Sequence, residues 1–135
     1  MHDRRAAAAG KGLSDTDLAN AGKRILIVED EPVIGFALED MLEAAGWRSS
    51  GIASRVAGAL KLLEAAPPDA AILDVNLHGE QSYPVADALA ELGIPYIFAT
   101  GYGDTQHPER HRAVPTVTKP YTIFEIQQAL DASGA

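Results

Sequence analysis

Short apolar segments alternate with amphipathic segments along most of this 135-residue chain, and this alternation constrains the fold more than any other feature. Apolar or partly apolar runs stand at residues 24–29, 47–53, 70–75, 95–99 and 114–118. Apolar residues recur every three or four positions, as in helices, over residues 32–45, 54–66, 84–92 and 122–132. Strands that alternate with helices predict an α/β fold, in which helices cover both faces of a parallel sheet.

The composition of the five runs predicts their order in the sheet. Residues 24–29, 70–75 and 95–99 are almost wholly apolar, which is typical of strands buried on both faces. The run 47–53 contains Arg-Ser-Ser-Gly and the run 114–118 contains a proline, which suits edge strands. We therefore predict a doubly wound sheet of order 2-1-3-4-5, with its ligand site beyond the carboxyl ends of the strands.

Two segments lack a sustained helical pattern. Residues 1–22 are polar and rich in Ala and Gly, and we expect a flexible N-terminal arm, in which SDTDLANA could form a short helical turn. Residues 101–115 contain two glycines and two prolines, which leaves room for one or two helical turns near residues 109–112. We expect the fourth helix to be short or disordered, and the folded domain to span residues 23–132.

The composition argues against several functions. Without cysteine, the chain cannot form disulfides, thiolate metal sites or a cysteine nucleophile. A formal net charge of −8 argues against nucleic acid as a direct partner. The apolar runs are too short to span a membrane, and the N-terminus lacks a secretory segment. We therefore expect a cytoplasmic protein of one domain.

Charged or hydroxyl side chains end four of the predicted strands. They are Glu29 and Asp30, Asp74, Thr100 and Lys119. In a parallel sheet these ends meet at one edge, where two carboxylates about 4 Å apart repel by roughly 4 kcal/mol at a surface-like dielectric. The carboxylates therefore require cations, and oxygen ligands of this kind suit Mg²⁺ (or Mn²⁺), which shares its coordination shell with phosphate.

This chemistry makes Asp74 a candidate nucleophile toward phosphorus, with Thr100 and Lys119 holding the phosphoryl oxygens. Each residue alone also has a simpler interpretation. Asp30 before Glu31 and Pro32 suits a helix cap, and a single Asp at a strand end is often a turn residue. The joint occurrence at four strand ends favours the phosphoryl site.

The motifs that carry these residues resemble the receiver domain of two-component response regulators, the CheY-like superfamily, over about residues 23–132. They are ILIVEDEP, AILDVNL, FATGY and VTKPY. The resemblance implies a flavodoxin- or CheY-like fold, a phosphoacceptor, a metal site, a phosphate-binding pair and a cis peptide before Pro120. The phosphoacceptor would be Asp74, and Thr100 and Lys119 would bind the phosphate. The metal would be held by Asp30, Asp74, the Asn76 backbone carbonyl and, through water, Glu29. The cis peptide would be Lys119-Pro120.

One departure from the usual receiver pattern indicates a particular branch of the receiver family. Thr116 stands where many receivers place an aromatic switch residue, and FATGY and VNLHGEQSYPVADAL match the branch nicknamed FAT GUY. We hypothesise that residues 101–113, beginning with Gly101, are mobile and become ordered on phosphorylation. Tyr102 would then substitute for the missing aromatic.

The resemblance implies a stand-alone response regulator rather than an enzyme, because the chain ends after its last predicted helix. It would accept phosphate on Asp74 from a histidine kinase, for which the resemblance indicates the HWE/HisKA2 type, or from a phosphotransfer protein. It would then signal or drain phosphate through protein contact, as a monomer or weak dimer. The alternatives are an Asp-nucleophile phosphatase or phosphotransferase, although Asn76 stands where such enzymes place a second Asp, and a phosphate-independent docking module.

The four histidines, His2, His78, His107 and His111, are not spaced as metal pairs, and we expect each at the surface. Arg110, His111 and Arg112 form a basic spot, which is either a contact surface or a solvated loop.

Overall fold

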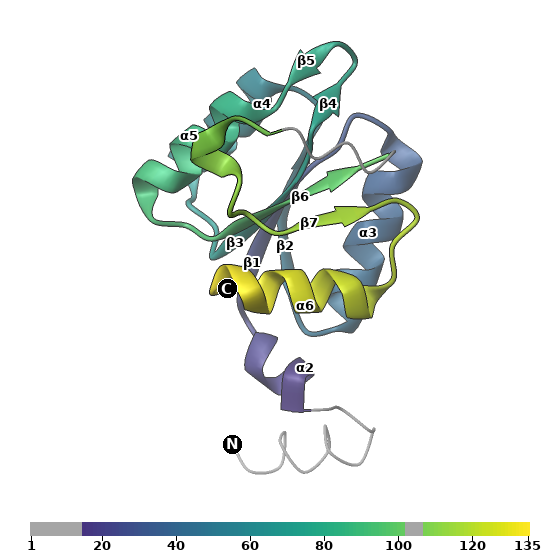
Figure 1. Ribbon diagram of the computed structural model, residues 1–135. Helices are drawn as coiled ribbons and strands as arrows, with labels where there is room; N and C mark the ends of the chain where they lie inside the picture. The colour runs from purple at the N-terminus through teal and green to yellow at the C-terminus, as the bar shows by residue number, and fades with distance from the viewer. Residues whose placement is uncertain (1–14, 102–106) are drawn as a thin grey trace.

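A five-stranded parallel sheet forms the centre of the molecule. The computed structural model describes residues 15–101 and 107–135 (Figure 1). The order β2-β1-β3-β6-β7 confirms the predicted 2-1-3-4-5 arrangement. The strands are β1 (Arg24–Val28), β2 (Arg48–Ala53), β3 (Ala70–Asp74), β6 (Tyr96–Thr100) and β7 (Thr116–Thr118).

Helices cover both faces of the sheet (Figure 1). On one face, apolar side chains of β1, β3 and β6 pack against α4 and α5. Alternate side chains of the same strands pack against α3 and α6 on the other face. This two-sided burial explains the unbroken apolar runs of the three central strands. The helices of the described residues are α2 (Asp15–Asn20), α3 (Pro32–Ala44), α4 (Val56–Ala65), α5 (Tyr83–Leu92), α6 (Ile123–Ser133) and a 3₁₀ helix at Glu109–His111.

Local sequence signals fix several helix ends. Pro32 begins α3, where its missing N–H costs no hydrogen bond. Thr122 and Glu125 form a capping box at α6: each side chain accepts a hydrogen bond from the backbone N–H of the other. Gly93 ends α5 in the left-handed conformation that glycine adopts most easily.

The short helical turn that the sequence allowed within SDTDLANA is present, and it packs against the domain. Residues 15–20 form α2, and the side chain of Asn20 is buried. The Asn20 amide donates hydrogen bonds to the Ala45 carbonyl and to Oε1 of Gln127, both at 2.9 Å. These contacts join α2 to the end of α3 and to α6, and sequence periodicity over six residues cannot reveal them. Residues 1–14 lie outside the described residues.

The segment after β3 contains two short strands that no run in the sequence indicated. Residues Asn76–Leu77 (β4) and Glu80–Gln81 (β5) pair as an antiparallel hairpin. In the last crossover, the 3₁₀ helix Glu109–His111 confirms the short helix expected there. Residues 102–106 lie outside the described residues, so the mobility of this segment and the role of Tyr102 stay predictions.

His107 and His111 are buried, so their predicted surface position is wrong. His107 bonds the Tyr83 hydroxyl through Nδ1 and Oγ1 of Thr116 through Nε2, both at 2.9 Å. His111 bonds the Tyr96 hydroxyl through Nδ1 at 2.7 Å, and Oδ1 of Asp87 through Nε2 at 2.8 Å. Both ring nitrogens of each histidine thus have partners, which makes burial tolerable.

The predicted basic spot is consequently smaller than its sequence indicates. His111 lies beneath the surface, and the guanidinium of Arg110 makes a two-pronged ion pair with Asp87, at 2.7 and 3.0 Å. Arg112 is exposed. Within the ranges that the structure describes, no helix has the length and apolar character needed to cross a membrane.

Candidate functional site

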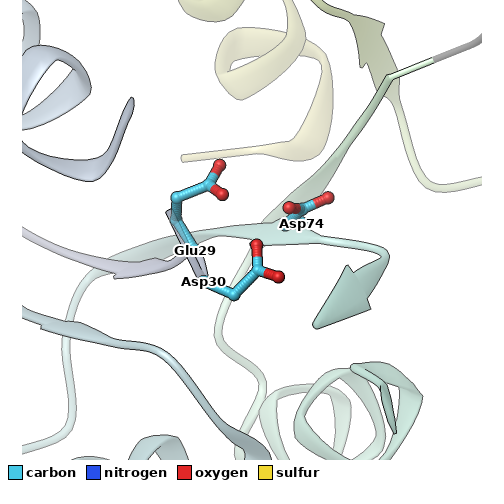
Figure 2. A group of neighbouring side chains, drawn as sticks. All are labelled: Glu29, Asp30 and Asp74. Carbon is cyan, nitrogen blue, oxygen red and sulfur yellow. The ribbon is translucent and has the colours of Figure 1, made fainter. Parts of the chain in front are cut away.

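Three carboxylates converge at the carboxyl end of the sheet (Figure 2). Glu29 and Asp30 directly follow β1, and Asp74 is the last residue of β3. The two strands are paired, with Val28 opposite Leu73, and this register brings their ends together. One oxygen from each carboxylate lies within 4.8 Å of the others. The convergence predicted from the strand ends is therefore present.

Thr100 and Lys119 come to the same edge from β6 and from the end of β7, the two strands that follow β3 in the order of the sheet. Nζ of Lys119 lies 2.8 Å from Oε1 of Glu29 and 3.1 Å from Oδ2 of Asp74. Thr100 ends β6, and its carbonyl accepts a hydrogen bond from the backbone N–H of Lys119 at 2.8 Å. The Lys119-Pro120 peptide bond is cis, as the resemblance implies.

Burial and mutual attraction shift the pKa values of Glu29 and Lys119. Glu29 is only 3% exposed, and burial raises its pKa to about 7, although hydrogen bonds from Lys119 and from the Glu31 backbone oppose this rise. Burial opposes the charge of Lys119, but the hydrogen bond to Glu29 and the attraction of Asp74 prevail and raise its pKa. One ammonium thus serves two carboxylates.

The donor set fits a hard divalent cation. Three carboxylates whose nearest oxygens lie within 4.8 Å of one another match the oxygen chemistry of Mg²⁺. The alternative interpretation of Asp30 as a helix cap finds no support, because the residue at the N-cap of α3 is Glu31. Asn76 lies in β4, two residues beyond Asp74, and its side chain accepts a hydrogen bond from the Gly79 N–H. The metal role of its backbone carbonyl stays a prediction.

The other predicted residues lie around this edge. Gly101 follows β6 and is exposed. Thr116, at the start of β7, is half-buried and bonded to His107. An imidazole from the crossover therefore contacts the position where an aromatic switch residue is usual.

Sequence reasoning missed one neighbour of the site. Nδ1 of His78 lies 2.6 Å from Oδ2 of Asp30. His78 and Gly79 form the turn of the β4–β5 hairpin, and both have positive φ angles, of 52° and 86°. A polar residue followed by Gly, between two short pairs of strand residues, is the signal that predicts such a turn.

A pH prediction follows from the burial of Glu29. Because its pKa in the folded protein is raised to about 7 from 4.5, the folded state holds a proton that the unfolded chain releases between these values. The metal-free protein should therefore lose stability through this group as pH rises from 4.5 to 7, and lose no more above 7. Denaturant unfolding of wild type and Glu29→Gln in chelator measures the difference. A difference that does not vary with pH contradicts the prediction.

Comparison with known proteins places this site in a family. The family model described as "Response regulator receiver domain" matches residues 25–131. The transcriptional regulatory protein PdtaR of Mycobacterium tuberculosis is 30% identical over 87% of this chain and 59% of its own length. The phyllosphere-induced regulator PhyR of Methylorubrum extorquens is 35% identical over 83% of this chain and 43% of its own length. The match thus covers less than two thirds of the length of these relatives.

Solved structures agree with this match. SdrG from Sphingomonas melonis superposes with a TM-score of 0.75 at 48% identity, covering 84% of this chain and 97% of that chain. The receiver domain of PhyR from Erythrobacter litoralis gives a TM-score of 0.70 at 28% identity, covering 87% and 96% respectively. The chain therefore belongs to the response regulator receiver domain family.

Proposed function

We propose that this protein accepts a phosphoryl group on Asp74 from a histidine kinase or a phosphotransfer protein. The observation that carries the proposal is the meeting of three carboxylates and Lys119, contributed by the ends of β1, β3 and β7, at one edge of the sheet. An oxygen of Asp74 attacks phosphorus, the P–N bond of the phosphohistidine breaks, and the imidazole nitrogen keeps the electron pair.

The chain's own residues have distinct parts in this transfer. Lys119 lies within reach of Asp74 and would hold one phosphoryl oxygen, and Thr100 would hold another. Glu29, Asp30, Asp74 and the Asn76 carbonyl would hold the divalent cation, which offsets the added negative charge when it is bound. We propose no turnover of free phosphate esters, so the protein would not act as an enzyme.

The partners and the setting follow from the same proposal. We infer a stand-alone regulator, and the match that covers 97% of SdrG supports this part of the proposal. We also propose that it acts in the cytoplasm, as a monomer or weak dimer. The FATGY motif supports the FAT GUY branch and a kinase of the HWE/HisKA2 type. Exposed apolar side chains of α3 and α6, Phe36 and Phe124, support a protein partner.

The test is intact-mass measurement after incubation with acetyl phosphate and Mg²⁺. Wild type should gain one phosphoryl group, and Asp74→Asn should gain none, because the amide is not a nucleophile toward phosphorus. The exposed Asp40 on α3 provides a matched control, and Asp40→Asn should be phosphorylated like wild type. Phosphorylation of Asp74→Asn would refute the assignment. Many turnovers on a free phosphate ester would favour the phosphatase alternative.

A further inference from the structure

The hairpin beyond β3 has a defined shape at its turn. The positive φ angles of His78 and Gly79 form a tight two-residue turn between β4 and β5. Oδ1 of Asn76 accepts a hydrogen bond from the Gly79 N–H at 2.9 Å and closes this turn. Leu77 is fully buried in the core that contains α4 and α5. Turn geometry and burial therefore fix the backbone of His78.

The hairpin is attached to the body of the domain by contacts at Glu80 and at Ser82, the residue after β5. Oε1 of Glu80 accepts a hydrogen bond from the backbone N–H of Val56, the first residue of α4, at 3.1 Å. The Ser82 N–H donates to the Val75 carbonyl at 3.0 Å. None of these contacts involves the acidic cluster. The hairpin thus holds His78 beside the site through contacts that do not depend on the site itself.

His78 is the partner of the one carboxylate that Lys119 does not bind. Lys119 lies within 3.1 Å of both Glu29 and Asp74. Asp30, whose side chain is 9% exposed, lies 2.6 Å from Nδ1 of His78. Within residues 15–101 and 107–135, no other hydrogen bond or ion pair is seen for the Asp30 carboxylate. Asp30 therefore depends on His78 for its orientation.

We propose that His78 is a positioning residue that holds the Asp30 carboxylate ready for a divalent cation. A carboxylate can bind a ring N–H through one oxygen and a metal through the other. Figure 2 shows one oxygen of Asp30 directed toward Asp74 and the second directed away. The imidazole is 66% exposed, so it supplies this hydrogen bond without a large cost of burial. Partners of this kind orient metal ligands, and their loss typically weakens metal binding about 10- to 100-fold.

The inference rests on the proposed function only in requiring that the site bind Mg²⁺. The experiment is calorimetric titration of the metal-free protein with Mg²⁺. His78→Gly removes the ring, and glycine tolerates the positive φ angle at this position. The dissociation constant of this variant for Mg²⁺ should therefore be about tenfold higher than that of wild type. His78→Asn should restore most of the affinity: asparagine also accepts this φ angle, and its Nδ2 takes the place of the ring Nδ1. Gln81→Ala, in the same hairpin, should bind like wild type.

A measurement on wild type guards against variants that fail to fold. The ¹⁵N shift of His78 Nδ1 should keep its hydrogen-bonded value when Mg²⁺ saturates the site. A bond that breaks on Mg²⁺ binding, or a His78→Gly variant with equal or tighter affinity, overturns the inference and leaves the proposed function intact. If His78→Asn binds as weakly as His78→Gly, the inference is also overturned. Absence of Mg²⁺ binding to wild type overturns both.

Discussion

Replacement of Lys119 by methionine should lower the free energy of unfolding of the metal-free protein by about 3 kcal/mol at pH 8. Lys119 is 18% exposed and binds Glu29 and Asp74, which are more buried still. Methionine preserves much of the side-chain volume and removes the charge, so two carboxylates lose their common partner. Denaturant unfolding in chelator measures the loss. Lys61→Met, at an exposed position of α4, should change stability by less than about 0.5 kcal/mol.

Two further observations separate this electrostatic effect from a packing defect. At pH 5 the penalty should be smaller, because burial raises the pKa of Glu29 to about 7, and a Glu29 that already holds a proton carries no charge that needs the Lys119 ammonium. Mg²⁺ should also stabilise the variant more than wild type, because the variant site has one positive charge fewer to repel the ion. Mg²⁺ stabilises the protein because it binds the folded state more tightly than the unfolded chain. A penalty that is unchanged by pH and by Mg²⁺ would contradict the electrostatic explanation.

The part of the site that lies at strand ends could be predicted because parallel strands share one direction. Once β1, β3 and β6 were recognised as buried central strands, Glu29, Asp74 and Thr100 had to meet at one edge. Neither pairing register nor side-chain conformation was needed for that inference. The sheet order followed in the same way, from which runs were wholly apolar and which were interrupted.

The features that sequence reasoning missed depend on contacts between distant segments. His107 and His111 are buried because tyrosine hydroxyls, Thr116 and Asp87 complete their hydrogen bonds, and these partners lie on α5, β6 and β7. Taken alone, HPERHR is typical of a solvated loop. Likewise, a six-residue segment such as α2 has little intrinsic helical stability, and its position comes from the buried amide of Asn20.

The contact of His78 with Asp30 was missed for the same reason, because it joins segments that are distant in the sequence. No strand or helix was predicted between residues 75 and 84, and without one the sequence gives no reason to place an exposed histidine against Asp30. The hairpin turn and its attachment to α4 do so in three dimensions. Residues whose roles depend on backbone direction were therefore predictable here, and residues whose roles depend on a turn or a distant hydroxyl were not.

The second large effect should come from Phe98, in the middle of β6. Its ring is fully buried and lies 4.4 to 5.9 Å, between ring centroids, from Tyr83, Tyr96, His107 and His111. Phe98→Ala leaves a cavity among these rings and should lower the free energy of unfolding by about 4 kcal/mol. Denaturant unfolding measures this change.

The chain offers a matched control of the same residue type. Phe124 on α6 is 80% exposed, so Phe124→Ala should change stability by less than about 0.5 kcal/mol. Hydrogen exchange should also become faster at residues 107–111 in Phe98→Ala, because the two histidine rings lose the surface on which they pack. None of the rings around this cavity belongs to the acidic cluster, so the affinity for Mg²⁺ should remain within about threefold of wild type. This change is smaller than the loss expected when a residue that orients a metal ligand is removed. Equal destabilisation by the two Phe→Ala changes would mean that the buried rings do not hold the last crossover against the sheet.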